Sequence, residues 1–344
     1  VWHGLKPMNY YRKRMTRFCS EFGFESLPDM KAIEKFAKPS DYSLSSDVFK
    51  SHQKCANGND KMIYYIASRF NLPKEFKDYV YLSQVTQNEC IADATEHWRR
   101  NKGRCNGSMY WQFNDCWGVC SWSSLDYYGN YKALQYGAKH FNAPLSISIE
   151  NTSDYIRVFV LNDLNENKTV DAEYEIFDFE NGTLETNKRT LTVGAVKNSV
   201  VFDLNVPFIC SEYDKKRTGI AVRLYENSAL IQQKAVLFCR ENELRLPKAE
   251  LKTVFEETAD GLKVTVSSDK YARLVKVESS KSTLPFSDNF FDLLPGQKKT
   301  VTIKNDTSIS TTELRNSITA YSLSDIPFSN NKLDTKFKQL KVFL

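Results

Sequence analysis

A carboxylate stands inside an apolar, aromatic stretch near the start of the chain. Glu21 lies in the run 17–24, which contains three phenylalanines, and Gly23 follows it two residues later. A carboxylate in such surroundings is costly unless it is hydrogen-bonded, paired or used in chemistry. A short apolar run that ends in an acid and a glycine is typical of a buried parallel strand ending at a cleft, where the catalytic groups of (β/α)8 barrels sit. From these residues alone, the alternative is a core strand whose Glu21 is neutralised by Arg17 or Arg14.

A second short strand carries the kinds of side chain that bind sugars. The stretch 107–117 ends in Gln112, Asn114 and Asp115, which stand between two tryptophans. Indole rings stack on the C–H faces of sugars, while amides and carboxylates bind the hydroxyls, and Trp is rarely this dense for core packing alone. A long helical stretch separates the two strands, so we expect them to be neighbours in one barrel.

These two stretches resemble a known family. Residues 20–28 read SEFGFESLP, and residues 110–141 read YWQFNDCWGVCSWSSLDYYGNYKALQYGAKHF. Both resemble the C-terminal part of the β-mannosidases of glycoside hydrolase family 2. The opening Trp2-His3-Gly4 also fits the segment before the nucleophile strand of that family. The resemblance is dense over the first 144 residues and looser afterwards.

The resemblance implies the chemistry of a retaining glycosidase, which uses two carboxyl groups about 5–5.5 Å apart. It makes Glu21 the nucleophile that attacks the anomeric carbon and forms a glycosyl-enzyme. The family's acid/base, a Glu that follows an Asn, would lie upstream of residue 1. Trp111 would form the floor or wall of the sugar subsite, and Asn114 and Asp115 would bind hydroxyls or orient Glu21.

Other residues near these strands are assigned less directly. By the same resemblance, Trp2 and His3 would line the mouth of the site, although a lone histidine is more often structural. Trp117 and Trp122 either border the site or pack under the helix that follows. Glu25 departs from the family, which more usually has Gln at this position.

The elements that must position these groups alternate between strand and helix over residues 1–143. Apolar residues at i, i+3 and i+7 predict helices, and short apolar runs predict strands. Strands are expected at Met15–Phe22 and Met109–Asn114, and helices at Met30–Phe36, Asp60–Phe70, Phe76–Arg100 and Asn130–Phe141. This order predicts the last part of a (β/α)8 TIM barrel.

After Pro144 the hydrophobic period changes from 3.6 to 2. About seven short strands over residues 144–243 predict an immunoglobulin-like β-sandwich, followed by a charged connector at Glu241–Pro247. The strands expected in this sandwich include Leu145–Ile149, Ile156–Val158, Ala172–Ile176, Ser199–Phe202, Ile220–Tyr225 and Ala235–Cys239. A second sandwich is expected over residues 244–344, with strands at Glu250–Phe255, Leu262–Val266, Arg273–Val277, Phe290–Leu293, Thr300–Ile303 and Ser317–Tyr321. The predicted fold class is therefore multidomain: the last part of a barrel followed by two immunoglobulin-like sandwiches.

Composition excludes several classes of function. Among 344 residues the net charge is only +5, and no basic block alternates with aromatic residues, so we expect no nucleic-acid partner. No apolar run approaches the roughly 20 residues of a membrane span, so we expect no membrane partner. The eight cysteines are scattered, which favours buried thiols over disulfides, and no Cys/His set predicts a metal site. No cofactor is implied.

The function expected is that of a retaining exo-β-mannosidase, which hydrolyses terminal β-D-mannosyl residues of an oligosaccharide or glycoside. One alternative is another family 2 activity: β-galactosidase, β-glucuronidase or exo-glucosaminidase. The other is a non-catalytic carbohydrate-binding fragment built on the two sandwiches. Because the acid/base is expected upstream, we predict that this chain alone is inactive and that its partner is the N-terminal remainder of the same enzyme.

Overall fold

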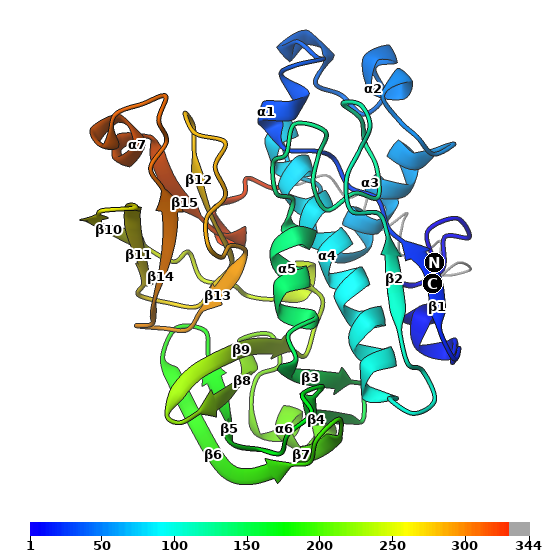
Figure 1. Ribbon diagram of the computed structural model, residues 1–344, viewed down its shortest axis with the longest axis vertical. Coiled ribbons are helices and arrows are strands. Elements are labelled where there is room, and N and C mark those ends of the chain that lie inside the picture. The colour runs from blue at the N-terminus through cyan, green and yellow to red at the C-terminus, as the bar shows by residue number, and fades with distance from the viewer. Residues whose placement is uncertain (330–344) are drawn as a thin grey trace.

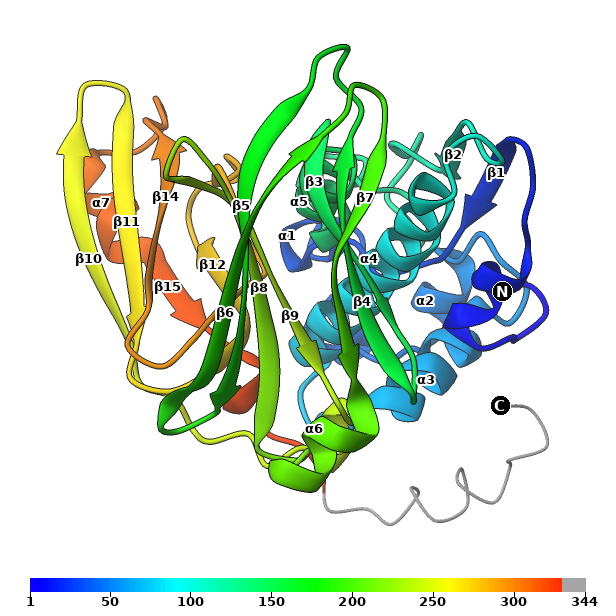
Figure 2. The ribbon, with the colours of Figure 1, turned by 90° about the horizontal axis from the view of Figure 1, so that it is seen from below.

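The computed structural model describes residues 1–329, which form three parts (Figures 1 and 2). The N-terminal part consists of helices packed against two short strands, and it ends with helix α5 (Ala133–Phe141). Two all-β parts follow, the first over residues 145–237 and the second over residues 251–321. In Figure 1 the first all-β part lies below the other two, and each of the three has its own hydrophobic core.

The N-terminal part is built on two parallel strands, β1 (Cys19–Gly23) and β2 (Ser108–Trp111). Their register pairs Cys19 with Ser108 and Gly23 with Trp111, so the carboxyl ends of both strands meet at one edge. The connection between them runs through α1 (Met30–Ile33), α2 (Asp47–Ser51), α3 (Gly58–Arg69) and α4 (Phe76–Arg100). Strand β1 begins later than predicted because Met15, Arg17 and Phe18 are exposed.

Helix α4 covers one face of the strand pair. Phe22 of β1 packs on Trp98 of α4 with ring centroids 4.7 Å apart, and the Trp98 indole N–H donates to the Arg14 carbonyl at 2.9 Å. Helix α5 lies along α4, and a Cβ at Gly137 would stand 1.7 Å from the side-chain oxygen of Asn88. A glycine therefore lets the two helices approach closely. The predicted helix Phe76–Arg100 is confirmed at both ends.

The first all-β part is a sandwich of two antiparallel sheets. One sheet has the order β3-β4-β7 and the other β6-β5-β8-β9. Their bounds are β3 Leu145–Asn151, β4 Tyr155–Asn162, β5 Lys168–Asp178, β6 Gly182–Val193, β7 Asn198–Asn205, β8 Thr218–Glu226 and β9 Ala229–Leu237. Strand β6 has no counterpart among the predicted strands because nearly all of its side chains are exposed at the sheet edge, which leaves no apolar alternation to read.

The second all-β part is also a sandwich, with sheet orders β10-β11-β14 and β13-β12-β15. The strands are β10 Leu251–Thr258, β11 Gly261–Ser268, β12 Ala272–Ser279, β13 Phe291–Leu293, β14 Lys298–Lys304 and β15 Ile318–Tyr321. All six predicted strands are found here. The short helices α6 (Val206–Glu212) and α7 (Thr311–Ser317) were not predicted, and they begin at the capping side chains of Asn205 and Ser310. The predicted range 244–344 includes residues 330–344, which lie outside the described residues.

A cluster of buried charges joins the helical part, the connector between the sandwiches and the second sandwich. Arg69 of α3 donates to Glu241 of the predicted connector at 2.6 Å and also contacts Glu89 of α4. Arg273 of β12 contacts both carboxylates at 3.0 Å and Asp292 of β13 at 3.1 Å. The connector is therefore held in place by two guanidinium groups, one from the helical part and one from the second sandwich.

Two further observations concern the part of the chain that the structure describes. Within residues 1–329, no helix combines the length and apolar character that crossing a bilayer requires. All eight cysteines are free thiols, and four of them, Cys55, Cys90, Cys105 and Cys120, are buried.

The charge cluster predicts a pH-dependent contribution to stability from Glu241. Burial alone would raise the pKa of Glu241, but Arg69 and Arg273 outweigh it and lower that pKa to about 2. A lowered pKa stabilises the fold above the unfolded value of about 4.3, and this contribution is lost as the pH falls toward 2. We expect Glu241→Gln to lower the Tm by about 5 °C or more at pH 7, because it leaves buried guanidinium charge uncompensated.

The measurement is thermal unfolding at pH 7 and at pH 3. The difference between Glu241→Gln and the unmodified chain should shrink at pH 3. As a control, Glu256→Gln removes an exposed pair with Lys263 and should leave the Tm unchanged at both pH values. An equal effect of Glu241→Gln at both pH values would contradict the assignment.

Candidate active site

The structure places Glu21 and Trp111 on the same open face of the two parallel strands. Phe22 and Tyr110 are register partners, and both turn toward the helices. The register shifts between Cys19 and Phe22, so β1 is irregular just before Phe22. Glu21 and Trp111 are the chain neighbours of Phe22 and Tyr110, and both are exposed, Trp111 to 48%, so they face away from the helices. The two residues that the sequence assigned to nucleophile and sugar platform therefore share one face.

Gly23 is required for the close approach of the two strand ends. A Cβ at Gly23 would lie 2.6 Å from the Trp111 carbonyl oxygen and 2.9 Å from Cδ1 of Trp122. Any side chain here would push β2 away from β1. Trp122 is half-buried beside this contact, and its ring centroid is 6.0 Å from that of His3.

Asp115 is buried, and its carboxylate accepts three hydrogen bonds. It accepts hydrogen bonds from Lys54 at 2.8 Å, Gln112 at 2.9 Å and Ser121 at 2.6 Å. Its side chain is almost completely buried, so a direct contact with a sugar hydroxyl is not what the structure provides. Of the two predicted roles of Asp115, binding a hydroxyl is therefore corrected, and orienting Glu21 stays a prediction. In the structure Asp115 connects Gln112, the residue after Trp111, to Lys54 of the loop after α2.

Trp2 needs a correction as well. Its ring is 2% exposed, packs edge-on against Phe24 at 4.8 Å and stacks with Tyr65 at 5.9 Å. Its indole N–H donates to the Cys55 thiol at 3.3 Å. Trp2 is thus a core residue, whereas its neighbour His3 is exposed. The motif at the start of the chain indicated proximity to the site but not which of its side chains faces outward.

Asn114 and Trp117 are both exposed on the loop after β2. Asn114 therefore offers an exposed amide near the end of the strand that carries Trp111. Trp117 does not pack under helix α5, so the interpretation that it borders the site fits the structure better.

Sequence reasoning missed two buried ionisable side chains, Glu25 and Lys132. Glu25 follows β1, and Lys132 precedes α5, and both are buried. The Lys132 ammonium donates to the carbonyls of Ser26 at 3.3 Å and Ser121 at 3.2 Å. Neither Glu25 oxygen has a hydrogen bond of ordinary geometry, although the Gln53 amide lies nearby. The departure from Gln at position 25 was the one signal in the sequence that pointed here.

Burial controls the protonation of this pair. Desolvation raises the pKa of Glu25 to about 8, against the lowering effect of Lys132 and Lys61. Desolvation likewise lowers the pKa of Lys132 to about 8, against the raising effect of Asp115. At neutral pH a large fraction of Glu25 is therefore protonated.

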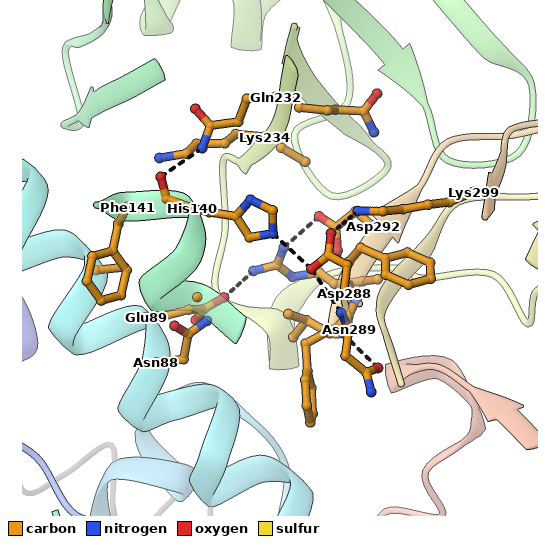
Figure 3. A pocket seen from close by; sticks show the side chains of 18 of the residues that line it. Asn88, Glu89, His140, Phe141, Gln232, Lys234, Asp288, Asn289, Asp292 and Lys299 are labelled. Atoms are coloured by element: carbon orange, nitrogen blue, oxygen red, sulfur yellow. Dashed lines mark hydrogen bonds and ion pairs between the residues drawn. The ribbon is translucent and has the colours of Figure 1, made fainter. Parts of the chain in front are cut away.

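A separate cavity of about 540 Å³ lies between α4, α5, β9 and the second sandwich (Figure 3). Several of its charges are paired: His140 and Lys299 contact Asp288 at 2.9 and 2.5 Å, and Lys234 contacts Glu96. None of the predicted site residues lines it. Among the described residues, this cavity lies where the three parts meet, and it is separate from the face that carries Glu21 and Trp111.

Comparison with known proteins finds matches to the two sandwiches and to most of the chain. Residues 154–240 match a mannosidase Ig/CBM-like domain, and residues 246–326 match an Ig-fold domain of the Ig_mannosidase model. The β-mannosidase of Bos taurus is 28% identical over 330 residues, which cover 90% of this chain and 37% of that protein. The β-mannosidase of Rattus norvegicus is 38% identical over 143 residues, covering 38% of this chain and 16% of that protein.

Solved structures give the same result. A β-D-mannosidase from Dictyoglomus thermophilum superposes with a TM-score of 0.86 and 28% identity, covering 94% of this chain and 39% of that one. An exo-chitosanase from Amycolatopsis orientalis shares the fold, with a TM-score of 0.72 and 18% identity over 94% of this chain and 44% of that one. The chain spans less than half the length of these relatives.

The fold and these matches define a class: the chain resembles glycoside hydrolases of family 2, and both immunoglobulin-like predictions are confirmed. More narrowly, it resembles the C-terminal part of a β-mannosidase, as the motifs around Glu21 and Trp111 had indicated.

The buried carboxyl of Glu25 predicts a stability effect with a definite pH dependence. Its pKa is raised to about 8 in the folded chain, against about 4.3 when unfolded. The pH dependence of stability is therefore the reverse of that for Glu241. The protonated Glu25 carboxyl contributes stability that is fully present below pH 4.3 and is lost as the pH rises through 8. Glu25→Gln cannot ionise, so we expect its Tm relative to the unmodified chain to rise with pH, by about 5 °C between pH 5 and pH 9.

The experiment is thermal unfolding at pH 5, 7 and 9. Glu34→Gln, at an exposed carboxylate on the end of α1, serves as the control and should show no such trend. A Tm difference for Glu25→Gln that is independent of pH would rule out a buried titrating carboxyl.

Proposed function

We propose that this chain is the C-terminal portion of a retaining exo-β-mannosidase that removes terminal β-D-mannosyl residues. The observation that carries the proposal is that Glu21 and Trp111, from the two motifs, point to one open face of a parallel strand pair. The likeness to β-mannosidases over 90% of the chain supports it. We further propose that residues 1–143 are the last part of a (β/α)8 barrel, with sandwich domains at 144–243 and 244–344.

In the proposed mechanism Glu21 acts as the nucleophile. Its carboxylate attacks the anomeric carbon, the bond to the leaving oxygen breaks, and a glycosyl-enzyme ester forms. A second carboxyl group protonates the leaving oxygen and then removes a proton from the water that hydrolyses the ester. By the resemblance, this acid/base is a Glu upstream of residue 1, and it would stand about 5–5.5 Å from Glu21.

The surrounding residues have supporting roles in this proposal. The Trp111 ring stacks on the mannosyl ring, and the exposed amide of Asn114 binds a hydroxyl. Asp115 is a positioning residue, because its bonds to Gln112 and Lys54 hold the loop that continues from Trp111. His3 stands exposed beside Trp122 and contributes to the rim.

Two alternatives remain distinct from this proposal. Another family 2 activity would use the same Glu21 on a different sugar, and the exo-chitosanase similarity, at 18% identity, speaks only for the fold. A non-catalytic carbohydrate-binding fragment would leave Glu21 without a chemical role. Turnover of an aryl β-mannoside by the enzyme that contains this chain tests the first alternative, and the dependence of that turnover on Glu21 tests the second.

The first test replaces the nucleophile in the enzyme that contains this chain. Glu21→Gln should lower kcat on an aryl β-mannoside by about three orders of magnitude or more, with an unchanged Tm, because covalent catalysis is lost while the shape is kept. Glu34→Gln is the matched control and should retain kcat within about twofold. Near-normal turnover by Glu21→Gln would refute the assignment.

A rescue experiment makes the role of Glu21 specific. Glu21→Ala leaves space for a small anion below the anomeric carbon. Added azide should restore turnover of an activated aryl β-mannoside and give the α-mannosyl azide. A single displacement inverts the configuration at the anomeric carbon, whereas the two displacements of a retaining enzyme restore it. Restored turnover with a β-configured product would argue against Glu21 as the nucleophile.

The second test concerns the chain on its own, which we expect to show no glycosidase turnover. General-acid assistance is worth roughly 10²–10⁴-fold, and the group proposed to supply it lies outside this chain. In addition, β1 and β2 form a sheet of only two strands in the described structure, so Glu21 faces solvent. Turnover should appear only when the upstream fragment is added, and turnover by the chain alone would show that it contains its own acid.

A further inference from the structure

An aromatic cluster stands on the loops next to the proposed sugar site. It consists of Phe36, His52, Trp117, Tyr127 and Tyr128, and we call it the ring cluster. Phe36 follows α1, His52 follows α2, and the other three lie on the long loop after β2. Figure 1 shows α1, α2 and this loop together at the top of the helical part.

The ring cluster is rigid at its base. The Phe36 and His52 rings stack with centroids 4.1 Å apart and planes within 9°. The Trp117 ring leans on His52 at 5.1 Å, and His52 Nδ1 lies 2.5 Å from the Gly118 carbonyl oxygen. The backbone also connects the two loops, since the Cys120 N–H donates to the His52 carbonyl at 2.8 Å. Trp117 is therefore held in a fixed orientation.

The outer members of the ring cluster remain open to solvent. Trp117 is 39% exposed, Tyr127 51% and Tyr128 45%. Gly118 stands between two of the rings: a Cβ there would lie 3.3 Å from both Phe36 and the Tyr128 hydroxyl. The exposed members are all aromatic and carry an N–H or O–H at the rim, which is the composition of a carbohydrate-stacking surface rather than of an aliphatic protein contact.

A short series of contacts connects the ring cluster to Trp111. Gln112, next to Trp111, donates to Asp115, and Asp115 also accepts from Lys54. Lys54 is two residues from His52, and Gln53 between them forms a bridge with Cys120. The ring cluster thus lies at the same end of the strands as Trp111 and is held by the same loops.

We propose that Trp117 and Tyr128 form a second saccharide subsite, which binds the sugar on the leaving-group side of the scissile bond in a β-linked oligosaccharide. This inference rests on the proposed function, because it assigns the first sugar to Trp111 and Glu21. The indole face of Trp117 stacks on the next pyranose ring, and the Tyr128 hydroxyl binds one of its hydroxyl groups. The enzyme would then favour oligosaccharides over simple mannosides.

The test compares two substrates of the full-length enzyme that contains this chain. β-1,4-Mannotriose supplies a sugar to the second subsite, whereas methyl β-mannoside supplies none. Trp117→Ala should lower kcat/KM on mannotriose about tenfold and leave kcat/KM on methyl β-mannoside within about twofold. For Trp117→Phe, which keeps an aromatic face, kcat/KM on mannotriose should lie between the values for Trp117→Ala and the unmodified enzyme. Phe208→Ala, at an exposed phenylalanine of the first sandwich, is the control and should change neither value.

The outcomes separate the inference from the proposed function. An equal loss on both substrates, or no loss on either, would overturn the second subsite, and an equal loss would instead indicate a contact with another part of the enzyme. If Trp117→Ala does not fold, Tyr128→Ala provides the same comparison at the other exposed ring. Failure of the unmodified enzyme to cleave methyl β-mannoside would contradict the proposed function itself.

Discussion

The arrangement of the site depends on the parallel pairing of two very short strands. Five residues of β1 and four of β2 define which side chains face the helices and which face outward. Gly23 is the closest point of contact, where the Trp111 carbonyl and the Trp122 ring occupy the space of a missing side chain. Such short strands cannot be stable alone, and the 25-residue helix α4 supports them by covering one face. The other face remains for Glu21 and Trp111.

Buried charge positions the remaining parts around this pair. Arg273 and Glu241 bring the second sandwich and the connector against helices α3 and α4. The ion pair between Asp115 and Lys54 likewise holds the loop after β2 against the loop after α2. Removing charges from water costs several kcal/mol per ion, so buried pairs add little net stability compared with apolar contacts. Their directional bonds instead define one arrangement among several that apolar packing alone would allow.

The sequence was most informative where one pattern is long or one motif is dense. Helix α4 was predicted at both ends because seven turns of consistent periodicity leave little ambiguity. Strand β6 was missed because both of its faces are polar. Residue types also do not reveal orientation: Trp2 and Asp115 fit the chemistry of a sugar site, yet the fold turns one into the core and pairs the other with Lys54. Such long-range contacts have no local signature in a sequence.

The central claim is that Glu21 forms a covalent bond with the sugar, and trapping that bond tests it most directly. A 2-deoxy-2-fluoro-β-mannosyl fluoride slows hydrolysis of the glycosyl-enzyme, because the fluorine destabilises positive charge in the transition state. After incubation with the full-length enzyme, mass spectrometry of a proteolytic digest should find one fluoromannosyl group, located on the peptide that contains Glu21. A label on any other carboxylate, or an enzyme inactivated without a label, would contradict the account.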